Sequence, residues 1–134
     1  MREFFDTSVL VASFWAGHRD HHASLKLVAS ANKKRSACAV HTLAEVYATM
    51  TALPVKDVIS PDQALLFVQE VRERFTVVTR TIELAAERGF AGGRIYDALL
   101  LRCAAKIKAE TIYTWNLRHF KAIDPKQADR VRTP

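Results

Sequence analysis

The sequence predicts an α/β fold with a central, mostly parallel sheet of about four to five short strands flanked by helices. Two observations predict this class. Short apolar runs alternate with segments of helical period, which is typical of strands linked by crossover helices. The strand runs are also apolar throughout, as expected for strands that are covered on both faces of a parallel sheet. With 134 residues and no linker or repeat, residues 1–134 are expected to form a single domain.

The expected elements follow in chain order: a strand at 4–5, a helix at 9–14, a helix at 20–29, a strand at 36–40, a helix from 42 to Pro54, a helix from 60 to 71, a strand at 75–80, a helix at 82–88, a helix at 95–108, a strand at 111–115, a helix at 117–122 and an edge strand at 131–133.

Capping and breaking residues support the first half of this order. Asp6-Thr7-Ser8 are three good capping types between the first strand and its helix, and Gly17 ends that helix. Pro54 ends the helix that Thr42 opens, and Ser60-Pro61 starts the next one, in which Ala64, Leu65, Phe67, Val68 and Val71 recur at helical spacing. Asp20 is expected to cap the second helix, where Leu25, Val28 and Ala29 form the apolar stripe.

The second half depends on β-rich runs and glycines. The runs "FTVVTR" at 75–80 and "TIYTW" at 111–115 are typical of strands. Gly89 ends the short helix after the first run, and Gly92-Gly93 precede the long helix.

Composition narrows the function classes. The net charge is +6 with a pI near 9.6, which favours a polyanionic partner. No apolar run reaches the roughly 18 residues that span a bilayer, and the first residues are not a secretory signal, so we expect a cytoplasmic protein without a membrane partner. Cys38 and Cys103 are too few and too far apart for a disulfide framework or a metal motif, and we expect both as small core residues.

Carboxylates and an amide follow the predicted strands. Asp6 comes directly after the first strand, Glu45 lies in the first turn after the second, and Asn116 follows "TIYTW". These side chains meet at one edge if the sheet is parallel, and Asp97 joins them if its helix begins near that edge. Like charges brought together repel, and such clusters are tolerated chiefly by binding a hard cation. Mg²⁺ or Mn²⁺ held by Asp6, Glu45 and Asp97 in a basic protein indicates phosphodiester chemistry.

Each acid also has a purely structural interpretation. Asp6 can cap the helix that follows it. Thr42 and Glu45 have the spacing of a capping box, in which the glutamate reaches back to a backbone amide. Asp97, near a helix start, interacts favourably with the helix macrodipole.

Four segments in this order, "FFDTSVLVASF", "HTLAEVYATM", "GRIYDALLLRCAAK" and "IYTWNLRHF", resemble the PIN-domain family of metal-dependent ribonucleases, most of all the VapC-type toxins of toxin–antitoxin pairs. The resemblance spans Asp6 to Phe120 and implies a PIN-like fold. It implies that Asp6, Glu45 and Asp97 hold the metal and act in catalysis, with the hydroxyl of Thr7 or Ser8 beside the first aspartate.

The sequence departs from the family pattern at two positions. Asn116 stands where many members carry a fourth aspartate, and it would contribute an oxygen ligand or orient a water. His119 stands where a further acid is often found, and it is expected as a solvated helix residue, with contact to a substrate phosphate or a proton relay as the alternative. Both changes remove negative charge, which weakens a second Mg²⁺ more than a first. Arg94 and Arg118 are expected to contact phosphates, or else to be ordinary exposed charges.

Aromatic residues near the motifs have two interpretations. Tyr96 and Trp115 are expected to fill the core, and stacking on RNA bases is the alternative. Phe14, Trp15, Leu66 and Phe67 are expected as core residues, although the resemblance implies that some of them line a groove for an antitoxin segment.

The sequence therefore predicts a Mg²⁺-dependent endoribonuclease, with Mn²⁺ as a possible substitute, that acts as the toxin of a toxin–antitoxin pair. The resemblance implies an RNA substrate, a cognate antitoxin, a homodimer and a possible hetero-oligomer with the antitoxin. Two alternatives stay open: a catalytically weak PIN module that binds RNA or a protein, and a metal-dependent phosphatase. The phosphatase lacks support because no Asp-x-Asp nucleophile motif is present.

Overall fold

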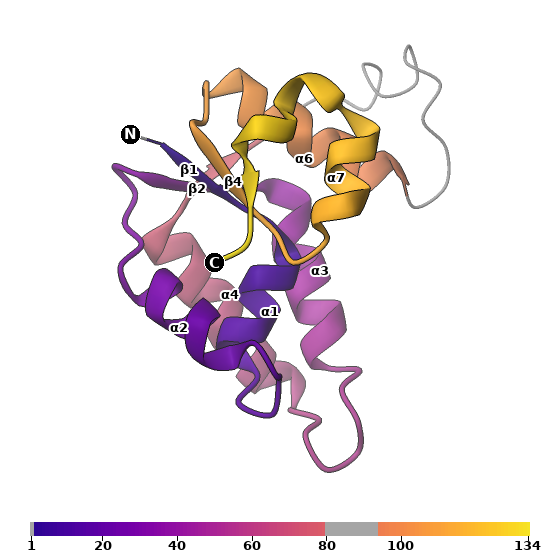
Figure 1. Ribbon diagram of the computed structural model, residues 1–134. Coiled ribbons are helices and arrows are strands. Elements are labelled where there is room, and N and C mark those ends of the chain that lie inside the picture. Colours follow the sequence, from indigo (N-terminus) through magenta and orange to yellow (C-terminus); the bar gives the residue numbers. More distant parts are fainter. Residues whose placement is uncertain (1, 80–93) are drawn as a thin grey trace.

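One parallel sheet with strand order β3-β2-β1-β4-β5 organises the molecule (Figure 1). The computed structural model describes residues 2–79 and 94–134. The elements are β1 (Glu3–Phe5), α1 (Thr7–Phe14), α2 (His21–Ala29), β2 (Ser36–Ala39), α3 (Val40–Met50), α4 (Pro61–Arg74), β3 (Thr76–Val78), α6 (Arg94–Lys106), β4 (Thr111–Tyr113), α7 (Leu117–Ile123), the 3₁₀ helix η1 (Pro125–Arg130) and β5 (Val131–Arg132). The predicted α/β class and parallel sheet are confirmed, and the edge strand at 131–133 is present as β5. The helix predicted at 82–88 lies outside the described residues.

Helices cover both faces of the sheet, and every residue of the strands β1 and β2 is buried. Phe5 and Cys38 belong to a core cluster with α1 to α4, whereas Phe4 and Ala37 belong to a second cluster with α6 and α7. Figure 1 shows α6 and α7 on one side of the strands and α1, α2 and α4 on the other. Neighbouring residues of a strand point to opposite faces, which explains why these runs are apolar without alternation.

The strand order reverses between the two strands at the centre. From β1 the chain moves to β2 and β3 on one side, and it returns to β4 and β5 on the other. In open parallel sheets, ligands bind beyond the carboxyl ends of the strands at such a reversal. The residues after β1 and β4, Asp6 and Thr114, stand at this point.

Several predicted details are wrong in informative ways. The α3 helix begins at Val40, two positions before Thr42, because the chain turns helical directly after the buried Ala39, which forms the N-cap without a side-chain bond. The apolar stripes are narrower than predicted, since Leu25 and Leu65 are 45% and 48% exposed. The start of α4 is confirmed, and Ser60 and Gln63 form a reciprocal capping box there.

Both cysteines are buried, as predicted, and burial raises the pKa of Cys38 to about 12, with Cys103 adding to the rise. Among the described residues, none of the helices combines the length and apolarity that a membrane crossing requires.

Candidate active site

Asp6 is a buried carboxylate held in place by hydroxyl groups. Its side chain, 5% exposed, follows β1, and its backbone N–H donates to the Tyr113 carbonyl at 2.9 Å. Oδ2 accepts from Ser8 Oγ at 2.7 Å and from Thr114 Oγ1 at 2.8 Å. Asp6 occupies the N-cap position of α1 but makes no side-chain capping bond. The capping interpretation of Asp6 is therefore wrong. A carboxylate has about four acceptor positions, so these two donors leave it able to bind a cation.

Glu45 reaches the same region from α3. Thr7 Oγ1 donates to Glu45 Oε1 at 3.3 Å, and His41 Nε2 lies 3.5 Å from the same oxygen. Because α3 starts at Val40, Thr42 lies inside the helix, and the capping-box interpretation is wrong. Burial raises the pKa of Glu45 to about 7. The Asp6 carboxylate adds to the rise, the Thr7 hydrogen bond opposes it, and Asp97 adds a smaller contribution.

Asp97 comes from the first turn of α6, across the sheet edge. His119 Nε2, on α7, lies 2.6 Å from Asp97 Oδ2. Burial raises the pKa of Asp97, and Asp6 raises it further, whereas the charge and hydrogen bond of His119 lower it. The place of Asp97 in the first turn of α6 is compatible with the macrodipole interpretation. That interpretation does not explain why the Asp97 carboxyl lies close enough to Asp6 for Asp6 to raise its pKa.

The three acids therefore act on one another electrostatically. Asp6 is a cause of the raised pKa of both Glu45 and Asp97, and Asp97 also raises that of Glu45. In the part of the chain that the structure describes, no three His, Cys, Asp or Glu side chains are arranged as a finished metal site. The donor set nevertheless fits a hard divalent cation, because it is made of carboxylate oxygens whose mutual repulsion a cation would relieve.

The other acid near the first strand has a different role. Glu3 is buried at the opposite end of β1, where Arg35 Nη2 lies 3.0 Å from Glu3 Oε1 and the Ser36 hydroxyl is 3.5 Å from Oε2. A guanidinium partner satisfies this carboxylate within the fold, whereas the side-chain partners of Asp6 among residues 2–79 and 96–134 are neutral hydroxyls.

Of the remaining predicted site residues, some bond to the acids and others only line a nearby cavity. Thr7 and Ser8 bond Glu45 and Asp6, respectively. Asn116 is exposed at the N-cap of α7, donates its backbone N–H to Thr114 Oγ1 at 3.0 Å, and lines the same cavity as Thr7 and Ser8.

Of the two arginines predicted to contact phosphates, the structure describes the side chain of one. Arg118 is exposed on α7, where it lines a shallow hollow with His119. The side chain of Arg94 lies outside the described part of the chain.

Two residues of the site were not predicted from the sequence. Thr114 is fully buried and donates to Asp6, but a threonine that ends an apolar strand carries no distinguishing signal. His41 lies one helical turn before Glu45, a spacing that becomes visible once the helix is known to begin at Val40. Burial lowers the pKa of His41, against the opposing effects of Asp6 and of a backbone hydrogen bond with Tyr96. The predicted core position is wrong for Tyr96, which is 49% exposed, with its ring 5.8 Å from that of His41.

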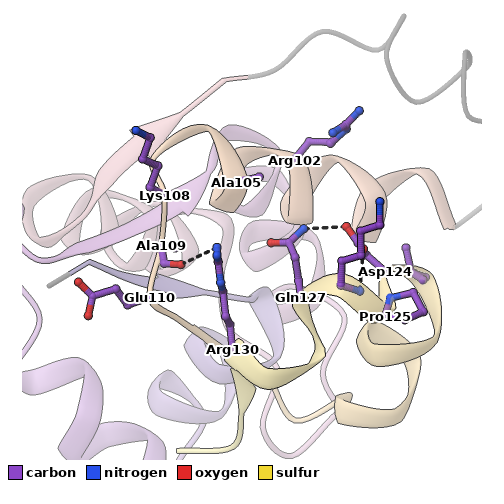
Figure 2. A pocket seen from close by; sticks show the side chains of 11 residues that line it. Arg102, Ala105, Lys108, Ala109, Glu110, Asp124, Pro125, Gln127 and Arg130 are labelled. Carbon is purple, nitrogen blue, oxygen red and sulfur yellow. Dashed lines mark hydrogen bonds between the residues drawn. The ribbon is translucent and has the colours of Figure 1, made fainter.

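Two cavities lie near opposite ends of β4. One, of about 960 Å³, opens near its amino end, where it is lined by residues such as Lys108, Gln127 and Arg130 (Figure 2). The other, of about 400 Å³, opens beside Thr7 and Ser8 at the carboxyl end. The smaller cavity is lined by Thr7 and Ser8, which donate hydrogen bonds to Glu45 and Asp6, respectively.

Fold and site together define a class of protein. The PIN domain family model matches residues 4–125, and the chain belongs to the PIN-domain family. Ribonuclease VapC27 of Mycobacterium tuberculosis is 33% identical over 110 residues, which is 78% of this chain and 78% of that protein.

Solved structures share the fold. VapC20 of Mycobacterium tuberculosis, described as a sarcin–ricin loop cleaving toxin, has a TM-score of 0.69 at 19% identity, covering 90% of this chain and 94% of that one. VapBC-1 from nontypeable Haemophilus influenzae has a TM-score of 0.63 at 16% identity, covering 99% and 98%. The predicted resemblance to VapC-type PIN proteins is confirmed.

Proposed function

We propose that residues 1–134 form a single-domain endoribonuclease that hydrolyses RNA phosphodiester bonds with Mg²⁺, or Mn²⁺ in its place. The observation that carries the proposal is the convergence of Asp6, Glu45 and Asp97 at the reversal of the parallel sheet, where each of the last two has its pKa raised by Asp6. The naming of a relative with 33% identity as a ribonuclease supports the choice of RNA as substrate.

The three acids would hold the metal, and their neighbours would hold the acids. Ser8 and Thr114 orient Asp6, Thr7 and His41 orient Glu45, and His119 orients Asp97. When bound, the ion supplies positive charge that favours a hydroxide nucleophile and stabilises negative charge on the phosphate. The exposed Asn116 would contribute a neutral oxygen at the rim, and the exposed Arg118 and His119 are placed to meet phosphate oxygens.

The biological role follows the same relatives. We propose that the protein is the toxin of a toxin–antitoxin pair, that it forms a homodimer, and that an antitoxin binds it. Support comes from solved relatives named as VapBC assemblies. A dimer or antitoxin surface has apolar candidates on α4, where Leu66 is 63% exposed, and on α3, where Tyr47 is 39% exposed.

Cleavage of labelled single-stranded RNA tests the enzymatic proposal. Mg²⁺ or Mn²⁺ should support cleavage and a chelator should abolish it. Asp6→Asn, Glu45→Gln and Asp97→Asn should each lose activity while they keep the fold. Asp62→Asn is the matched control, because Asp62 is an exposed aspartate in the first turn of another helix, α4. Full activity in Asp97→Asn would exclude the assignment. RNA binding without cleavage in any metal would favour the catalytically weak module instead.

A further inference from the structure

Both tryptophans of the chain line the cavity that Thr7 and Ser8 also line. The sequence contains two, Trp15 and Trp115, and both line the cavity of about 400 Å³. Trp15 follows α1, and Trp115 follows β4, so residues far apart in the sequence form the two walls. We call this the tryptophan cavity. Its volume is within the range of small-ligand sites.

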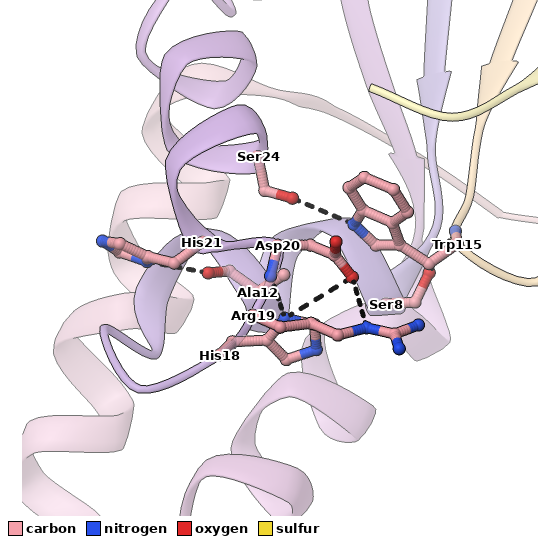
Figure 3. A network of polar contacts seen from close by, with 8 residues as sticks. All are labelled: Ser8, Ala12, His18, Arg19, Asp20, His21, Ser24 and Trp115. Carbon is pink, nitrogen blue, oxygen red and sulfur yellow. Dashed lines mark hydrogen bonds and ion pairs between the residues drawn. The ribbon is translucent and has the colours of Figure 1, made fainter.

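The Trp115 ring is anchored by its polar edge. Nε1 donates to Ser24 Oγ at 2.9 Å, and the backbone N–H donates to Ser8 Oγ at 3.0 Å, as Figure 3 shows. The ring is half-buried, so it packs on the core and still lines the cavity. An aromatic ring with its donor already satisfied offers its face for stacking.

The Trp15 ring is confined from the other side. A Cβ on Gly17 would lie 2.9 Å from Trp15 Nε1, so the glycine allows the backbone to approach the ring. His18 meets this ring edge-on, with centroids 5.5 Å apart.

Charged and polar groups complete the cavity. Arg19 lines it, and its side chain is 90% exposed, with Nε 3.2 Å from Asp20 Oδ2. Asn116 and Thr49 add amide and hydroxyl groups. Aromatic faces combined with an exposed cation and a few hydrogen-bonding groups are what proteins use to hold single-stranded RNA.

One side chain connects the tryptophan cavity with the acids. Ser8 Oγ donates to Asp6 Oδ2 at 2.7 Å and accepts the backbone N–H of Trp115. A group in the cavity is therefore a close neighbour of a group bound at Asp6.

We propose that the tryptophan cavity binds one base of single-stranded RNA by stacking on Trp115, with Arg19 at an adjoining phosphate. The position of this base next to the scissile bond rests on the proposed ribonuclease function; the binding of RNA in the cavity does not. Stacking is available to every base, so the subsite places the strand more than it reads its sequence.

Intrinsic fluorescence tests the proposal because the only two tryptophans both line the cavity. A short oligouridylate is titrated into the metal-free protein in chelator, so that no cleavage occurs. We expect saturable quenching. Trp115→Leu should weaken oligouridylate binding, followed by fluorescence anisotropy of labelled RNA, by about 10-fold or more, which corresponds to loss of one stacked base. Trp115→Phe should recover much of the affinity, since it keeps a ring.

Arg19→Ala is a second test of the proposal, and it leaves the core undisturbed because the Arg19 side chain is exposed. It should weaken binding and reduce the slope of log affinity against log salt by about 1, as expected for one lost phosphate contact. Arg72→Ala is the matched control, because Arg72 is an exposed arginine on α4 that does not line the cavity. The control should leave both affinity and slope unchanged.

The outcomes separate this proposal from the proposed function. If RNA causes no quenching, or if Trp115→Leu and Arg19→Ala both bind RNA as the wild type does, the cavity is not an RNA subsite, whatever the cleavage assay shows. A cavity that responds to a peptide and not to RNA contradicts the proposal equally. If binding depends on Trp115 and Arg19 but no metal supports cleavage, the subsite stands and the nuclease assignment fails.

Discussion

Replacing Glu45 by glutamine isolates the electrostatic cost of gathering the acids. Glutamine keeps the length of the side chain and can still accept the hydrogen bond that Thr7 donates to Glu45 at 3.3 Å. It removes the charge that burial and the neighbouring carboxylates disfavour. We therefore expect Glu45→Gln to stabilise the metal-free protein and to abolish cleavage.

The magnitude follows from the pKa of Glu45, which the fold raises from 4.5 to about 7. Each pKa unit corresponds to about 1.4 kcal/mol, so the rise amounts to roughly 3 kcal/mol before screening. Because the side chain is 38% exposed, solvent screening reduces the expected gain to about 1–2 kcal/mol.

The pH dependence has a definite sign. Below pH 4.5 the carboxyl is protonated in both the folded and the unfolded protein, and it contributes no cost. Between 4.5 and about 7 the folded state retains a proton that the unfolded state releases, so wild-type stability falls as the pH rises. The gain from Glu45→Gln is therefore small in acid and complete above about pH 7.

Urea denaturation in chelator, followed across this pH range, measures the effect. Glu73→Gln is the control, because Glu73 is an exposed glutamate on α4, and its change should stay within about 0.5 kcal/mol. With excess Mg²⁺ the order should reverse, since only the wild type gains the stabilisation of a tightly bound ion. A gain that is the same at all pH values, or no gain at all, would refute the placement of Glu45 among interacting carboxylates.

Three further predictions concern the residues around the acids. Thr114→Val removes a hydroxyl donor from the buried Asp6 carboxylate and should cost about 1–3 kcal/mol in urea denaturation; an unchanged midpoint would contradict that hydrogen bond. His119→Ala removes the ring nitrogen that lies 2.6 Å from Asp97 Oδ2, so calorimetric titration should show Mg²⁺ binding weakened by about 10-fold, because Asp97 loses the side chain that orients it; an affinity equal to that of the wild type would exclude this orienting role. Asn116→Asp adds a carboxylate at the rim and should tighten Mg²⁺ binding while lowering the melting temperature of the metal-free protein; if both stay unchanged, position 116 lies outside the site.

The local sequence pattern was sufficient to predict the strands of the sheet and the residues that follow them. The apolar runs at 4–5 and 111–113 could be recognised without any tertiary information, because a strand covered on both faces has few polar residues. Two of the three acids could be picked out for a related reason, since Asp6 directly follows a strand and Asp97 lies in the first turn of a helix. Glu45 lies beyond the first turn of α3, whose start the sequence pattern placed two residues too late.

The structure alone decided what those acids contact. The capping interpretations of Asp6 and Glu45 are compatible with the sequence, and they are wrong because the partners, Thr114 and Thr7, are supplied by other parts of the chain. Hydrogen bonds between residues 108 positions apart, such as Thr114 with Asp6, leave no mark in local spacing.

The sequence by itself determined the α/β class and the parallel strands, because periodicity and capping are properties of neighbouring residues. It also offered Asp6, Glu45 and Asp97 as candidate metal ligands, and that assignment stays a prediction. Only the tertiary structure decided that the strand order reverses at β1 and β4, that His119 meets Asp97, and that the two tryptophans form one cavity beside Asp6. These facts depend on which distant segments pack together. Packing depends on the fit of whole surfaces, which the spacing of residues along the chain does not encode.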